Sequence, residues 1–190
     1  MAITAIGIKN AIQQKLDSLN DEGVYSSLSV HTAWADGIRE YLTSNLKIGG
    51  LYVGVTNANP LVTDTLGGEY VWDVTSFELT GETLQSQTQG LTTTGFDVWI
   101  MEIESAIQGI EFTGVDITDK ITTESLTPLE DFVFSIAKAD LMQAESVGDI
   151  MAILAQKLYD SIMDIDVSEQ VVAAESTTPG TGTVTYTELS

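Results

Sequence analysis

The stretch TPLEDFVFSIAKADLMQAESVGDIMAILAQKLYDSIMDID, residues 127–166, carries the clearest helical pattern in the chain. Thr127 can cap a free backbone N–H, Pro128 suits the first helical position, and Glu130 completes a capping box. A second helix start follows at Ser146. Two apolar stripes at helical spacing go with these starts: Leu129, Phe132, Val133, Ile136 and Ala137, then Ile150, Ile153, Leu154, Leu158 and Ile162. The pattern predicts a helical hairpin that would be the nucleus of the core.

The N-terminal residues predict a second pair of helices. Apolar residues recur at helical spacing over residues 3–19, and Gly23 is well placed to end that helix as a C-cap. A second helix is expected over residues 30–46. Gly37 lies on its apolar stripe, which indicates either close approach of another element or a tolerated cost in helix propensity.

The middle of the chain changes to a β pattern. Strands are expected over residues 48–55, 69–79 and 112–117, because these segments are rich in β-branched and aromatic residues. Residues 81–94 are expected to form a long exposed loop, and a further helix should follow from Thr94. The predicted fold is therefore α+β, with helical pairs over about residues 3–46 and 127–166 packed on a small, mainly antiparallel sheet from the middle.

The composition shifts again at residue 168. Residues 175–182 resemble a flexible linker, and residues 184–189 alternate in the manner of a strand. We expect one domain over residues 1–167 and an extended arm over residues 168–190, which would add a strand to a neighbouring sheet. The alternative is a frayed tail. If the arm does add a strand to a neighbouring sheet, removing residues 175–190 should weaken assembly and leave the helical signal nearly unchanged. The predicted contacts with neighbours lie on this arm and on the loop 81–94, at Val184, Tyr186, Leu189, Leu84 and Leu91.

The charge balance excludes several classes of partner. The chain has 28 acidic and seven basic residues, for a formal net charge of −21. Direct nucleic-acid binding is not expected, since it depends on Lys and Arg that displace phosphate counterions. Binding to an anionic membrane is disfavoured for the same reason. The first residues contain no basic leader with a long apolar run, so no secretion signal is expected.

Few residues of the chain point to catalysis or metal binding. There is no cysteine, and His31 is the only histidine, placed at an expected helix start. A histidine-dependent catalytic triad and a thiolate metal site therefore lack their residues. Clusters of oxygen donors occur at Asp116 and Asp119 and at Asp160, Asp164 and Asp166, but neither has the spacing of a calcium loop. We expect no enzyme activity and no cofactor. The three tryptophans lie in apolar patterns, which favours core packing over a platform for sugars or bases: Trp34, Trp72 and Trp99.

One segment resembles part of a known group of proteins. WADGIREYLTSN, residues 34–45, followed by glycine-rich β sequence, is similar to a helix-then-strand passage in small structural (virion) proteins of tailed bacteriophages. The chain departs from those short proteins in carrying a second helical part over residues 127–166. The resemblance implies a structural role in a particle, and it transfers no functional residue.

These observations lead to one main hypothesis and one alternative. The chain is expected to be a non-enzymatic structural component of a phage-like virion, in the capsid, neck or tail. It would be made in the host cytoplasm, form a homo-oligomer and contact other virion proteins. The alternative is an extracellular or surface binding module, with calcium dependence included in that alternative.

Overall fold

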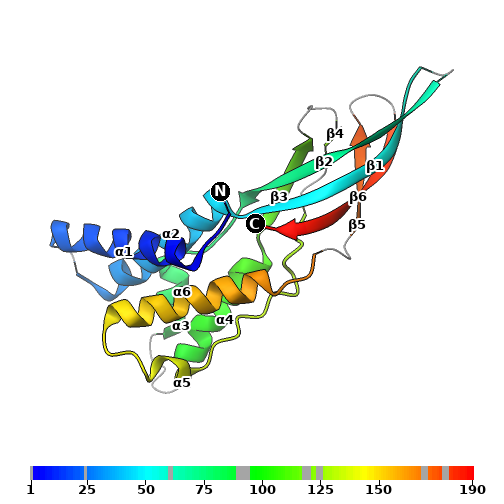
Figure 1. Cartoon of the computed structure of the whole chain (residues 1–190). Coiled ribbons are helices and arrows are strands. Elements are labelled where there is room, and N and C mark those ends of the chain that lie inside the picture. The colour runs from blue at the N-terminus through cyan, green and yellow to red at the C-terminus, as the bar shows by residue number, and fades with distance from the viewer. Residues whose placement is uncertain are drawn as a thin grey trace.

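Helices gather at one end of the computed structural model and strands at the other (Figure 1). The helices are α1 (Ala5–Glu22), α2 (Ser27–Asn45), α3 (Gly81–Thr88), α4 (Gly95–Gln108), α5 (Lys138–Leu141) and α6 (Val147–Met163). The strands are β1 (Lys47–Asn59), β2 (Val62–Ser76), β3 (Glu111–Asp116), β4 (Ile121–Thr122), β5 (Val171–Ser176) and β6 (Gly180–Leu189). The structure describes residues 2–23, 25–59, 62–88, 95–116, 121–122, 126–167, 171–176 and 180–190. Within these ranges the backbone alone is described at 22, 52–59, 62–70, 87–88, 95, 115–116, 121–122, 171–176 and 180–181.

The strands form one closed antiparallel sheet, a barrel with the strand order β1 to β6. β1 pairs with β2 on one side and with β6 on the other, which closes the ring. The two-residue β4 joins β3 to β5. The fold therefore has the α+β class and the antiparallel sheet that the sequence predicts.

The predicted C-terminal arm is part of this sheet, so the prediction of a free arm is wrong. β6 lies between β1 and β5, with Val184 opposite both Tyr52 and Val172. At its end the backbone N–H groups of Lys47 and Ser190 each donate to the carbonyl of the other residue, at 2.8 and 2.9 Å. Both described parts of the predicted arm, β5 and β6, thus belong to the closed sheet. Removing residues 175–190 would open the sheet, so an unchanged helical signal is no longer expected.

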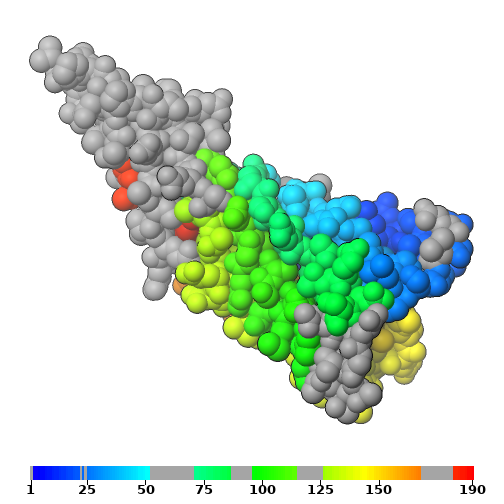
Figure 2. Space-filling model, turned by 180° about the vertical axis from the view of Figure 1, so that it is seen from behind, coloured from blue at the N-terminus to red at the C-terminus, as the bar shows by residue number. Residues whose placement is uncertain are grey.

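The first half of the predicted helical hairpin is also wrong. Residues 126–137, here called the strap, form no helix: they contain a turn near Leu129 and a tight turn in which the N–H of Ile136 donates to the carbonyl of Phe134, and they have no other regular structure before α5 apart from the bridge at Leu126. Their side chains alternate between the core and the surface: Phe132 and Phe134 are buried, whereas Val133 and Ser135 are exposed. Figure 2 shows the yellow-green strap running beside the green α4 on one face of the molecule.

The remaining helix predictions are confirmed by their caps. The Thr4 hydroxyl accepts the N–H of Gly7 at the start of α1, and Gly23 ends that helix in the left-handed conformation at φ 66°. α6 begins after Ser146, whose hydroxyl accepts the N–H of Asp149 and donates to its carboxylate. That hydrogen bond lowers the pKa of Asp149. α2 starts three residues earlier than expected, because Ser26 and Ser29 cap it reciprocally.

The segment predicted as a long loop over residues 81–94 begins with a helix. α3 starts after Thr80, whose hydroxyl accepts the N–H of Thr83 at 3.2 Å. Leu84 anchors this helix, since its side chain is fully buried. Residues 89–94, including the expected cap at Thr94, lie outside the described part of the chain. The helix expected to follow is α4.

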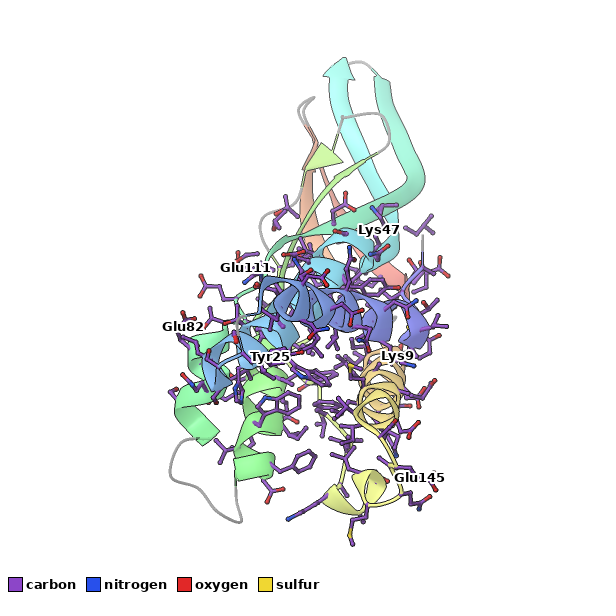
Figure 3. All side chains as sticks on the ribbon, turned by 90° about the vertical axis from the view of Figure 1, so that its left-hand side faces the viewer. Lys9, Tyr25, Lys47, Glu82, Glu111 and Glu145 are labelled. Carbon is purple, nitrogen blue, oxygen red and sulfur yellow. The ribbon has the colours of Figure 1, made fainter. Side chains whose placement is uncertain are left out.

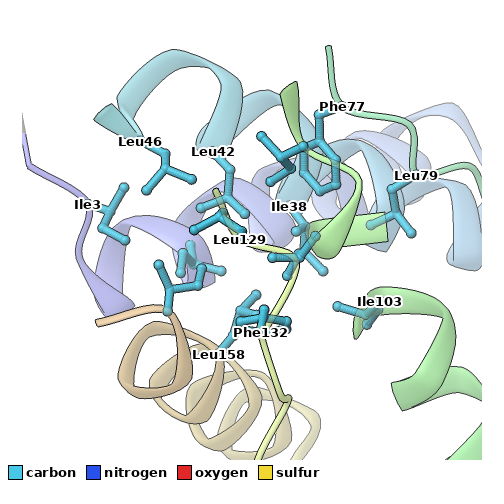
Figure 4. Close-up of a cluster of buried hydrophobic side chains, with 14 of the residues drawn as sticks. Ile3, Ile38, Leu42, Leu46, Phe77, Leu79, Ile103, Leu129, Phe132 and Leu158 are labelled. Atoms are coloured by element: carbon cyan, nitrogen blue, oxygen red, sulfur yellow. The ribbon is translucent and has the colours of Figure 1, made fainter. Parts of the chain in front are cut away.

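One apolar core runs from the helices into the closed sheet. Figure 4 shows a cluster of its buried side chains among the helices, the strap and the segment after β2. At the sheet end, the rings of Trp72 and Tyr186 meet edge to face with centroids 4.8 Å apart. The Trp72 ring also covers Gly50, where a Cβ atom would come within 2.5 Å of it. At the helical end, Trp34 packs edge-on against the buried Trp99 with centroids 5.6 Å apart. The three tryptophans therefore pack against the core, as predicted.

We predict that Gly37→Ala destabilises the protein by about 1–3 kcal/mol, the usual cost of overpacking. A Cβ at Gly37 would lie 2.7 Å from the Ile12 Cα, so α1 and α2 would have to move apart. The matched control is Gly148→Ala in α6, where the nearest atom is the Ser146 hydroxyl at 3.6 Å. Chemical denaturation should show a loss for the first variant and no loss for the second. Equal stability of Gly37→Ala and the unaltered chain would contradict the close helix contact.

We predict that the buried Tyr186 makes the protein less stable at high pH. Burial raises the pKa of Tyr186 to about 12, above the ordinary value of 10.0. The folded state therefore keeps this proton where the unfolded state has lost it, so stability falls as pH rises from 10 to 12. The slope from one such group is at most about 1.4 kcal/mol for each pH unit. Denaturation curves at pH 8 and at rising pH above 10 should show a smaller decline for Tyr186→Phe than for the unaltered chain. Equal losses of stability in the unaltered chain and in Tyr186→Phe would contradict the prediction that Tyr186 causes part of the decline.

Candidate functional site

The structure places the predicted neighbour contacts inside the fold. Three of these residues face the inside of the closed sheet: Val184, Tyr186 and Leu189. Leu84 lies on the buried side of α3. No more than 8% of any of these four residues is exposed. They hold this chain together and are not free for a neighbour, so the prediction is wrong for all four. Leu91 lies outside the described residues.

A groove lies between the strap and the C-terminal half of α6. Its volume is about 570 Å³. One wall is the exposed side of the strap, at Asp131, Val133 and Ser135. The other wall is α6 and the residues that follow it: Lys157, Asp160, Ser161, Asp164, Ile165 and Asp166. We call this hollow the strap groove.

Hydrogen bonds from α4 and α6 hold the strap in its extended form. The Gln108 amide donates to the carbonyl of Phe132 at 2.8 Å. The Glu104 carboxylate accepts the N–H of Phe134, also at 2.8 Å. Ser161, a buried polar residue on α6, accepts the N–H of Ser135 at 3.1 Å. Because these bonds fix the alternation of the strap, Val133 is presented to the groove with 62% of its surface exposed.

The α6 wall is strongly acidic because helical spacing gathers its aspartates on one face. Lys157, Asp160, Ser161 and Asp164 are three or four residues apart and therefore share one face of the helix. Asp160 and Asp164 lie at the C-terminal end, where the helix dipole already favours cations, and the last turn contains no basic residue. Lys157 forms its ion pair with Asp140 at 3.7 Å. The groove is thus a place where a positive charge from outside would be stabilised.

The rest of the described surface has the same excess of negative charge. Its other ion pairs are Lys15 with Glu40, Arg39 with Asp36 and Lys47 with Asp73. Figure 3 shows Glu82, Glu111 and Glu145 at separate places on the surface. A second hollow of about 430 Å³ lies between β2, α3 and α4, and it is also lined by carboxylates, at Glu78, Glu102 and Glu111.

The carboxylates do not assemble into a metal site in the described part of the chain. There, no three histidine or carboxylate side chains come together in a way that could hold a metal ion. This finding includes Asp160, Asp164 and Asp166. The side chains of Asp116 and Asp119 lie outside those described. His31 lies within α2, near its start, and its Nδ1 is 2.7 Å from the Ser27 carbonyl oxygen.

Comparison of the chain with family models, with curated proteins and with solved structures finds no match. No helix among the residues described combines the length and the apolar character needed to cross a membrane.

The sequence contained only part of the signal for this groove. Asp160, Asp164 and Asp166 were recognised as an oxygen-rich cluster, and the structure brings them to one hollow. Asp131 and Ser135 were not singled out, and Val133 was predicted on the buried apolar stripe, because a helix would turn Val133 away from the face shared by Asp131 and Ser135. The sequence DFVFS over 131–135 does not alternate in polarity, because the exposed Val133 is apolar, so the observed alternation of burial has no local signal in the sequence.

Proposed function

We propose that the chain is a non-enzymatic structural subunit of a phage-like virion, in its capsid, neck or tail, and that it receives a basic segment of another virion protein in the strap groove. The observation that carries the proposal is the groove itself, an open acidic hollow at a helix C-terminus. Its side chains are suited to binding the charged group of a lysine or arginine. They include no histidine or cysteine and no paired base that would activate Ser135 or Ser161.

The shape of the groove favours an extended protein segment. The strap wall presents alternate residues, with Val133 between Asp131 and Ser135. A partner strand with alternating basic and apolar side chains would place cations near the aspartates and an apolar group near Val133 and Ile165. Charge-assisted hydrogen bonds between Lys or Arg and carboxylates are stronger than neutral ones. Complementary charge also speeds association and selects the partner.

The surface charge argues for a protein partner. A formal charge of −21 repels nucleic-acid phosphates and anionic lipids alike. The placement in a virion is supported by the resemblance of residues 34–45, and the helix-then-strand order of that passage corresponds to α2 and β1. On this proposal the chain is made in the host cytoplasm and ends in the particle.

Mutation of the groove tests partner binding. We expect Asp160→Asn with Asp164→Asn to weaken binding of a labelled peptide that alternates lysine and valine by about tenfold or more, which corresponds to 1.4 kcal/mol. Each removed charge deprives the peptide of a charge-assisted contact. Fluorescence anisotropy at low and at physiological salt measures the affinity. A peptide with glutamate in place of lysine should not bind.

The chain offers a matched control for this experiment. Asp17 and Asp21 in α1 are also four residues apart near a helix C-terminus, and Gln13 donates to Asp17 as Gln156 donates to Asp160. Asp17→Asn with Asp21→Asn therefore changes the net charge equally without touching the groove. If both double variants weaken binding to the same extent, the peptide follows net charge and the groove is not its site.

Analysis of particles tests the proposed location. Phage-like particles purified from cells that produce the chain should contain it at a fixed ratio to the major shell protein, measured by quantitative mass spectrometry. A structural subunit is retained through density-gradient purification because its contacts are repeated in every particle. Loss of the chain during purification, or a ratio that varies between preparations, would contradict the proposal.

A further inference from the structure

Part of β2 has a partner strand on one side only. Residues 62–69 pair with β1, from Asn59 opposite Val62 to Leu51 opposite Glu69. β3 pairs with β2 only from Tyr70 onward, where Tyr70 lies opposite Asp116. On the far side of the hairpin, β6 covers β1 as far as Thr56, which lies opposite Gly180. In the described part of the chain, the hairpin therefore has one covered edge and one open edge.

The position of this open edge leaves it accessible. The β1–β2 hairpin extends farther from the helices than the other strands (Figure 1). A strand edge carries a row of backbone donors and acceptors that can pair with another strand. Proteins usually protect such edges with proline, lysine or a very short strand. Residues 62–69, VTDTLGGE, contain no proline and no lysine, and Asp64 and Glu69 are their only charged residues.

We propose that β2 of one copy pairs along this edge with β2 of a second copy, antiparallel and about a twofold axis at Leu66. In this register Asp64 lies opposite Gly68, and Glu69 lies opposite Thr63, so no two carboxylates face each other. Gly67 and Gly68 allow the second backbone to approach closely. The contact joins two closed sheets through the tips of their hairpins, in the mode of β-strand addition.

The charge of the chain favours this place of contact for a second copy. Each copy carries a formal charge of −21, so broad surfaces of two copies repel each other. Hairpin tips bring the copies together while keeping their helical ends far apart. Backbone hydrogen bonds supply the attraction and need no opposite charge. Salt screens the remaining repulsion, so pairing of two copies should strengthen with salt, whereas a basic partner strand would bind more weakly.

The inference rests on the proposed function only in that both require contacts between subunits, and it is tested on the purified chain alone. Sedimentation velocity over a range of concentration should show a dimer that strengthens as salt rises from about 0.05 to 0.5 M. Leu66→Glu should weaken the dimer by about fivefold or more, because two carboxylates then face each other on the axis. The control is Met101→Glu, which adds the same charge at an exposed position of α4, away from the sheet.

A charge swap completes the test. Leu66→Lys alone should also weaken the dimer, and an equal mixture of Leu66→Glu and Leu66→Lys should restore it as a heterodimer. A monomer at all concentrations for the unaltered chain, an unaffected Leu66→Glu variant, or a mixture that stays monomeric each overturns the proposal. A chain that is monomeric but present in particles at a fixed ratio would overturn this inference and leave the proposed function in place.

Discussion

Three side-chain hydrogen bonds keep the strap extended, and the arrangement of the helical end depends on them. Gln108 and Glu104 bind the strap from α4, and Ser161 binds it from α6. The strap pairs with β3 only at Leu126, opposite Phe112, so at Phe132, Phe134 and Ser135 side chains of the helices bind its backbone in place of a neighbouring strand. They allow Phe132 and Phe134 to fill the core between α4 and α6 while the opposite side of the strap faces water. The strap groove exists because the strap is extended and not helical.

The helices that were predicted correctly have their determinants close by in the sequence. Thr4 and Gly23 bound α1, Ser146 starts α6, and the apolar stripes between them need no knowledge of the rest of the fold. The strap shows the opposite case. Its local signals, Thr127, Pro128 and Glu130, favour a helix, but the groups that bind its backbone lie 24 to 30 positions away along the chain. Long-range contacts override a local preference of this kind, and they cannot be read from spacing.

The same reason explains the C-terminal strand. Its alternation correctly indicated a strand, and the error lay in the partner. β6 pairs with β1, more than a hundred residues earlier, and no pattern within residues 184–189 distinguishes that strand from one in another molecule. The groove could likewise be predicted from the sequence only in part. The acidic face of α6 follows from helical spacing, whereas the strap wall opposite it does not.

Acidic residues at the C-terminal end of α6 work against the stability of that helix. The helix dipole and the mutual repulsion of Asp160 and Asp164 both oppose folding by a few tenths of a kcal/mol each. A lysine or arginine in the last turn would relieve this cost, yet the chain has none there. Such a cost is removed when a cation arrives from another molecule, so it is converted into binding energy for a basic partner. On the proposed function, binding of the basic segment offsets this local disagreement between sequence and helix preference.

The two proposed contacts differ in the interaction that holds each of them together. The helical end carries the acidic strap groove, where attraction is electrostatic and falls with salt. The sheet end carries the open edge of β2, where attraction comes from backbone hydrogen bonds and the electrostatic contribution is repulsive. A highly acidic chain can associate with its own copies only where the backbone supplies the attraction, and with basic partners where the side chains supply it. The strap groove lies along the C-terminal half of α6, which points toward the sheet, and the β1–β2 hairpin extends away from the helices (Figure 1). The two surfaces are therefore separate, so one subunit could make both proposed contacts at once, which a repeating particle requires.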